Sequence, residues 1–218
     1  MKRRGLLALA LAAGFGLSLL SQGTSVQAAS AQDAKAEPPE DAGAFLIAVG
    51  ERATMELAES GIDEAERERR FRALFKESFD VAAISRFVLG VHWRRATAEQ
   101  KTAFQKVFED YVVQRFLPLF GDYSVDNFVV ERVRRDPNNP RHFFVVSKID
   151  RPSGPPAKVE WRIKEQDTSY RILDVTGEGV SLAITLRQEY SSVVRKDGID
   201  GLVRRLREKL DEGAFAPR

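Results

Sequence analysis

The sequence of 218 residues offers few side chains that could do chemistry, because it has no cysteine and only two histidines. His92 and His142 lie far apart along the chain, and no group of histidines and acidic residues has the spacing of a zinc site. No glycine-rich phosphate loop or dinucleotide-binding motif is present. Thiol chemistry is therefore excluded, and we expect neither a metal nor a cofactor.

The run Gly179–Ala183 (GVSLA) is the best match to a catalytic motif. It resembles the nucleophile elbow G-x-S-x-G, in which a serine stands at the turn from a strand into a helix. In the fold that carries this motif the catalytic histidine follows the serine, whereas no histidine follows His142 here. We therefore interpret Ser181 as a helix N-cap and predict that the protein is not an enzyme. A hydrolase that uses Ser181 stays an alternative.

Two acidic residues near the same turn are the other catalytic candidates. Asp174 and Glu178 lie close to the end of a predicted strand and could act as a carboxylate pair. Sequence alone does not give the distance between the two carboxylates, so the pair is a weak signal. The shortage of catalytic motifs favours a binding function.

The N-terminus has the three parts of a cleavable signal peptide, namely a basic start, an apolar stretch from Gly5 to Leu20 and a run of small residues. The apolar stretch is shorter than the roughly 20 residues that a membrane-spanning helix needs. We predict a signal peptide over residues 1–28, and cleavage after Ala31 is the alternative. Arg3-Arg4 resembles a twin-arginine signal, although export by the Sec route is favoured.

Removal of the signal changes the charge of the chain. The full sequence has a net charge of +2, but loss of three basic residues would leave 31 basic against 32 acidic residues. A nucleic-acid-binding protein would need a basic surplus, so no nucleic acid is expected as a partner.

Residues 29–42 are polar with two prolines and predict a flexible leader. We expect one soluble, monomeric domain over residues 43–212.

The first half of this domain has helical periodicity. Candidate N-caps precede two of the helices: Asp80 stands before one, and Thr97 with Gln100 forms a capping box before the longest. The predicted helices cover residues 43–59, 63–77, 81–90 and 98–120.

The second half alternates between apolar and polar residues, as strands with one solvent-exposed face do. Short connections between the runs predict an antiparallel meander of four strands. Ser181 would cap a following helix, and Asp197-Gly198 would break it before a last helix. The predicted fold is therefore α+β, with N-terminal helices, a four-stranded sheet and C-terminal helices. The strands cover residues 125–135, 142–150, 158–164 and 169–176.

One stretch makes the chain resemble a known family. Residues 79–112 contain Phe79-Asp80, Leu89-Gly90 and Trp93-Arg94, followed by Gln100, Phe104 and Phe108. Together with the later runs YRILDV (170–175), EGVSL (178–182) and GIDGL (198–202), they are similar to the MlaC family of auxiliary proteins of ABC transport systems. The resemblance covers about residues 43–210. Tyr170 and Arg171 depart from the Trp-Lys that the family favours, and Gly177 replaces a more usual apolar residue.

The resemblance implies a periplasmic carrier that holds the acyl tails of a phospholipid between a curved sheet and helices. Such a carrier passes lipid between an outer-membrane complex and an inner-membrane ABC transporter complex. A subgroup of the family is associated with hopanoids, so a hopanoid-type lipid is a second possible cargo. Physical chemistry agrees with this role, since two tails hold roughly 30 methylenes that each cost about 0.8 kcal/mol in water. An accessory protein-binding module without lipid cargo is the alternative.

The apolar stripes of the predicted elements supply candidate residues for the lining of the cavity. Strand 142–150 is apolar on both faces, so Phe143 and Val145 are alternatives to its predicted lining residues. Arg86, Arg94 and Arg187 are candidates to meet a headgroup phosphate. The predicted lining residues are Phe87, Leu89, Phe104, Phe108, Tyr111, Phe128, Val130, Phe144, Val146, Trp161, Ile163, Leu186 and Tyr190.

Overall fold

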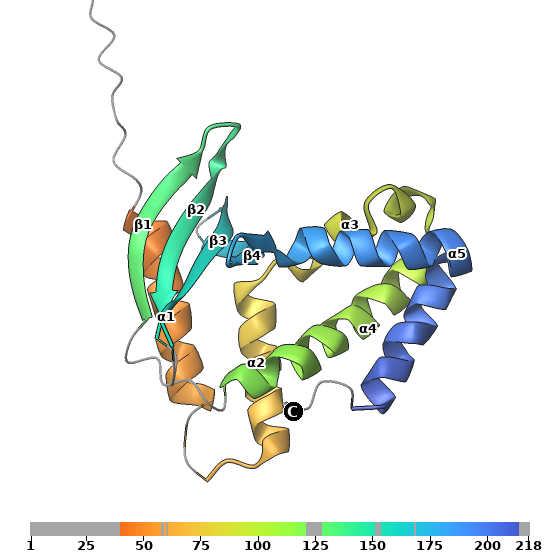
Figure 1. The fold of residues 1–218 in the computed structure, drawn as a ribbon, viewed down its shortest axis with the longest axis horizontal. Coiled ribbons are helices and arrows are strands. Elements are labelled where there is room, and N and C mark those ends of the chain that lie inside the picture. Colours follow the sequence, from red (N-terminus) through yellow and green to blue (C-terminus); the bar gives the residue numbers. More distant parts are fainter. Residues whose placement is uncertain are drawn as a thin grey trace, which may run out of the picture. The chain divides into compact units, whose positions relative to one another are not determined.

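The computed structural model describes residues 40–57, 59, 61–120, 128–150, 154–167 and 169–213. The predicted signal peptide and most of the predicted leader lie outside these residues. The described part is an α+β fold of helices and one antiparallel sheet, as predicted (Figure 1). Its elements are α1 (Glu40–Leu57), α2 (Glu64–Ser78), α3 (Val81–Leu89), the 3₁₀ helix η1 (Gly90–Arg95), α4 (Ala98–Phe116), the 3₁₀ helix η2 (Leu117–Phe120), β1 (Phe128–Asp136), β2 (Asn139–Ile149), β3 (Ala157–Gln166), β4 (Ser169–Gly177), β5 (Val180–Ser181) and α5 (Leu182–Asp211).

The helix starts are fixed by local side chains, and the predicted caps are confirmed. The Asp80 carboxylate accepts a hydrogen bond from the Ala83 N–H (2.8 Å) at the start of α3. Thr97 and Gln100 form the reciprocal capping box of α4. The Ser181 hydroxyl accepts from the Ile184 N–H (3.0 Å) at the start of α5. Each cap satisfies backbone donors that have no partner within the helix.

The sheet has the strand order β1-β2-β3-β4-β5, and every neighbouring pair is antiparallel. The strands are visibly curved in Figure 1. Five strands are present where four were predicted, because a two-residue strand (β5) pairs with the end of β4. Helix α1 begins at Glu40, ahead of the predicted position 43. The predicted break at Asp197-Gly198 is a kink within α5, where Gly198 has a φ of 71°.

Two apolar clusters organise the elements that bear on function. The helical cluster joins α3, α4 and α5 through buried residues such as Val88, Phe104 and Leu202. The sheet cluster joins α1 to β2, β3 and β4 through residues such as Leu46 and Phe143. Phe79, between α2 and α3, packs against both clusters. None of the helices in the described part of the chain has the length and apolar character needed to cross a membrane.

Candidate functional site

The register of the sheet decides which residues share its α1-facing side. Phe143 pairs with Ile163, and Ile163 pairs with Ile172 on the next strand. All three are 0–1% exposed and belong to the sheet cluster with Leu46 of α1. Because side chains alternate between the faces of a strand, Val145 and Trp161, which also pair, lie on the same face.

Helix α1 lies close against the β1–β2 half of this face. A side-chain Cβ added at Gly43 would lie 3.0 Å from Val133 Cγ2, and one added at Gly50 would lie 3.4 Å from the Phe128 ring. The two glycines are two turns apart and so stand on one side of the helix. The absence of side chains at both positions lets the backbone of α1 approach β1.

Helix α1 packs mainly on β1 and β2, and it reaches the β3–β4 half of the same face through the Phe45 ring, whose centre is 5.8 Å from that of Tyr170. Four apolar residues of this half are only partly buried, and we call them the apolar strip: Val159, Trp161, Tyr170 and Val175. The indole Nε1–H of Trp161 donates a hydrogen bond to the buried Ser147 hydroxyl (2.8 Å), which fixes the ring on this face. Partly exposed aromatic and branched side chains on a fixed surface are suited to contact with an apolar ligand.

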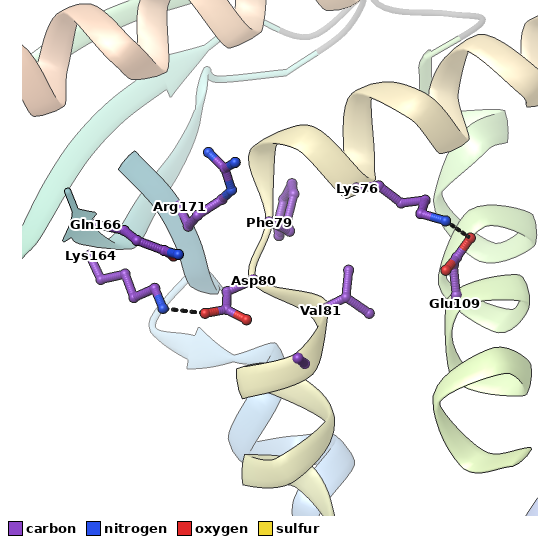
Figure 2. A pocket seen from close by; sticks show the side chains of 9 residues that line it. Lys76, Phe79, Asp80, Val81, Glu109, Lys164, Gln166 and Arg171 are labelled. Atoms are coloured by element: carbon purple, nitrogen blue, oxygen red, sulfur yellow. Dashed lines mark ion pairs between the residues drawn. The ribbon is translucent and has the colours of Figure 1, made fainter. Parts of the chain in front are cut away.

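A polar pocket of about 340 Å³, here called the edge pocket, lies where the edge of β4 meets the link between α2 and α3 (Figure 2). Phe79 lines it, so it borders both apolar clusters. Lys164 and Arg171 enter from the sheet, and Lys76 and Glu109 from α2 and α4, as Figure 2 shows. The pocket therefore places a charged rim beside apolar side chains.

Ion pairs hold most of this rim in place. Lys164 pairs with the Asp80 carboxylate, and Lys76 Nζ lies 3.7 Å from Glu109 Oε1. Burial works against ionisation of Asp80, but the hydrogen bonds from Lys164 and from the Ala83 N–H outweigh it and hold the pKa of Asp80 below its ordinary value. Arg171 donates to the Tyr170 carbonyl and the Ser169 hydroxyl and has no carboxylate partner among the described residues.

The predicted lining residues do not form one surface. Phe128, Val130, Trp161 and Ile163 belong to or pack on the sheet cluster on the α1-facing side. A second set belongs to or packs on the helical cluster, away from the sheet cluster, and there the Tyr190 ring meets Phe104 edge-on. This second set consists of Leu89, Phe104, Phe108, Tyr111, Leu186 and Tyr190.

The remaining three predicted residues face elsewhere. Phe144 and Val146 pair with Arg162 and Glu160, so they lie on the face of the sheet opposite α1. The Phe144 ring is stacked by Arg134, whose guanidinium carbon is 3.9 Å from the ring centre. Phe87 is 38% exposed on α3. The alternative pair Phe143 and Val145, not Phe144 and Val146, shares a face with Trp161.

The predicted headgroup arginines lie on the helices, apart from the edge pocket. Arg86 and Arg94 are exposed on α3 and η1. Arg187 of α5 lines a separate groove beside Phe87. Neither Lys164 nor Arg171 was among the site residues predicted from the sequence. Lys164 alternates with apolar residues along its strand, and this pattern is typical of a solvent-facing residue.

The elbow-like turn serves to start α5. Oxygens of Asp174 accept hydrogen bonds from the Ser181 hydroxyl and from the Ala183 N–H (3.0 Å). The two histidines bond elsewhere, since His92 Nε2 lies 3.4 Å from Ser191 Oγ and His142 Nδ1 lies 3.3 Å from Arg162 Nη2. Ser181 thus has the contacts of a helix cap. Within the described residues, no three His, Asp or Glu side chains group closely enough to hold a metal ion.

Comparisons with known proteins give three findings. The model of the family described as MlaC protein matches residues 51–208. The intermembrane phospholipid transport system binding protein MlaC of Haemophilus influenzae is 23% identical over 127 residues, which are 57% of this chain and 59% of that relative. A solved structure of the phospholipid-binding protein from Ralstonia solanacearum, in complex with a phospholipid, matches with a TM-score of 0.72 at 18% identity and covers 80% of this chain and 99% of that one. At this identity the match shows a shared fold.

Proposed function

Because the chain belongs to the MlaC family, whose model matches residues 51–208, we propose that it is a lipid-binding transport protein. Its cargo would be a phospholipid or a hopanoid-type lipid. It would carry this lipid across the periplasm between outer- and inner-membrane complexes of an ABC transport system. The name of the Haemophilus influenzae relative and the phospholipid in the Ralstonia solanacearum structure support the proposal. The N-terminal sequence pattern supports export.

The observation that carries the proposal is the apolar strip. Val159, Trp161, Tyr170 and Val175 are partly exposed next to a fully buried row, although water contact with apolar surface is unfavourable. Acyl tails laid along β3 and β4 would cover these side chains and leave water themselves. Of the residues predicted from the sequence, Trp161 is the one we retain for this contact. Phe128 and Val130 lie on the same face of the sheet but under α1, and Ile163 is fully buried.

We propose the edge pocket as the position of the headgroup, in place of Arg86, Arg94 and Arg187. The phosphate would meet Arg171, whose guanidinium is not neutralised by a described carboxylate. Asp80 and Glu109 line the same pocket and are paired with Lys164 and Lys76, so an ammonium group would share these carboxylates with the lysines. A pocket with both signs of charge is complementary to a zwitterionic headgroup. The predicted lining residues that lie in the helical cluster, such as Phe104 and Tyr190, would instead form the core that supports α3.

The test is the lipid content of protein purified without detergent, measured by native mass spectrometry and lipid extraction. We expect a stoichiometric lipid in the parent protein. Val175→Arg puts a charge on the strip and should remove the lipid. The control Val129→Arg makes the same change on β1, at a position that is 56% exposed and lies on the opposite face from Phe128. Circular dichroism checks that both variants fold.

Two results would overturn parts of the proposal. A parent protein without lipid that also takes up none from labelled vesicles would end the carrier function. Equal lipid content in folded Val175→Arg and Val129→Arg variants would remove the strip as the site. Replacement of Arg171 by Gln tests the headgroup position separately, because it should change which headgroups are retained while the amount of lipid stays the same.

A second candidate is an accessory module that binds protein and carries no lipid. The observation that favours it is the close packing of α1 on β1 at Gly43, which leaves no room for acyl tails on that half of the sheet. The lipid measurement separates the two functions, since the accessory module predicts an empty protein.

A further inference from the structure

A groove of about 480 Å³ lies at the C-terminal end of α3, whereas Asp80 and the edge pocket lie at the N-terminal end of this helix. One stripe of α5 forms most of its lining, at the spacing of successive helical turns. Phe87 of α3 closes the other side. The lining residues are Phe87, Ile184, Arg187, Gln188, Ser191 and Arg195, and none of them is acidic.

The guanidinium of Arg187 is held in place without an acidic partner. It stacks on the Phe87 ring, with its central carbon 4.9 Å from the ring centre. A Cβ at Gly90 would lie 3.0 Å from Arg187 Nε and Nη2, so the glycine makes room for the group. Among the described residues, Arg187 has no ion pair. A fixed guanidinium binds a carboxylate with little loss of side-chain freedom.

The surroundings of the groove are basic and apolar. Residues 81–96 contain three arginines and no acidic residue. By contrast, three of the four arginines of α2 form ion pairs with acidic residues, as Arg70 does with Glu66 at 2.7 Å. Apolar side chains also stand exposed at the groove, with Phe87 at 38% and Ile184 at 50%, and Val91 on η1 is 53% exposed.

From this groove we infer a docking site for a partner protein that presents carboxylates beside apolar side chains. A protruding side chain can enter a concave groove, whereas a bilayer surface cannot. The cations in the groove are both arginines, and arginine is enriched at protein interfaces while lysine is depleted. The site does not depend on the lipid cargo, because none of its residues belongs to the apolar strip or the edge pocket.

The test places a photo-crosslinking amino acid at Ile184 in cells that make the full protein. We expect an adduct whose partner peptide, identified by mass spectrometry, contains acidic and apolar residues. The same probe at Met55 of α1, which is 67% exposed, is the control position and should give no such adduct.

Charge variants show whether the groove itself makes the contact. The double change Arg187→Gln and Arg195→Gln should lower the yield of the adduct by about tenfold or more, because each of the two substitutions removes a charged contact. The double change Arg204→Gln and Arg207→Gln alters the net charge equally at exposed positions elsewhere on α5 and should leave the yield unchanged.

Three results would overturn the docking site. The first is the absence of an adduct at Ile184, and the second is an equal yield after both double changes. The third is binding to vesicles of phosphatidylcholine with phosphatidylglycerol that is lost with Arg187→Gln and Arg195→Gln, which would make the groove a membrane contact. Lipid content measured in the same preparations keeps this test separate from the carrier function.

Discussion

Leu46 and Ile47 are neighbours on α1, but their side chains lie in opposite environments. Leu46 is 1% exposed in the sheet cluster, whereas Ile47 is 40% exposed. Replacing Leu46 by Ala leaves a cavity against β2 and should cost about 2–5 kcal/mol of unfolding free energy. Replacing Ile47 by Ala should change it by less than about 0.5 kcal/mol, partly because alanine is the better helix former.

Thermal unfolding followed by far-ultraviolet circular dichroism measures this difference. For a domain of this size each kcal/mol shifts the Tm by about 2–4 °C. A cost of about 3 kcal/mol in Leu46→Ala therefore lowers the Tm by about 6–12 °C, while Ile47→Ala stays near the parent. Equal shifts in the two variants would refute the packing of α1 on the sheet through Leu46.

The same pair of variants also tests where the lipid lies. If the acyl tails cover only the β3–β4 half of the face, the loss in Leu46→Ala is the same in lipid-free and lipid-loaded protein. If the tails enter beneath α1, they fill the cavity left by Leu46, and the loss is smaller in the loaded protein. A smaller loss would contradict the assignment of the site to the apolar strip.

Two further predictions concern the kink of α5 and the pH dependence of stability. Gly201→Ala should lower the midpoint of urea unfolding, because the new Cβ would lie 2.4 Å from Asp197 Cβ. This overpacking outweighs the helix propensity of about 1 kcal/mol that alanine gains over glycine. A raised midpoint would contradict the geometry of the kink. Burial, and then the charge of Arg162, hold the pKa of His142 below its ordinary 6.5 in the folded protein, so the unfolded chain takes up the proton first as the pH falls. The free energy of unfolding should therefore decline as the pH drops from about 6.5 towards the lower folded pKa. His142→Gln should flatten this decline, as measured by urea titrations at several pH values. An unchanged dependence of the unfolding free energy on pH would count against a depressed pKa.

Local features were predicted well because their causes lie within a few residues. Asp80, Thr97 and Ser181 cap their own helices, so the residue types near the boundary were sufficient to place the starts of α3, α4 and α5. Gly198 has a positive φ, which explains why the predicted break is a kink. The strand β5 was missed because a two-residue strand has no periodicity to detect.

The face of each strand could not be predicted with the same success. In β2 the residues Phe143, Phe144, Val145 and Val146 are all apolar, so alternation gives no signal for the side that faces α1. The irregularity between Arg162 and Ile163 in the β3–β4 pairing also changes which residues lie opposite one another. The predicted lining set therefore mixed two faces of the sheet with the core of the helical cluster.

The edge pocket had no signal in the sequence for a related reason. Lys164 looks like an ordinary solvent-facing residue of an alternating strand, and Asp80 looks like an ordinary helix cap. Their ion pair joins segments far apart in the chain, so it depends on how the α2–α3 link meets the edge of the sheet. The Asp80 N–H donates to the Ile172 carbonyl (3.0 Å), which fixes that meeting point.

This meeting point also separates the two proposed surfaces. Asp80 at the start of α3 contacts β3 and β4, whereas Phe87 in the last turn of the same helix lines the groove with Arg187. A partner that docks in the groove would thus contact α3 and α5 without covering the apolar strip on the sheet. Such an arrangement suits a carrier, because the surface that holds the cargo stays open to a partner while the complex forms.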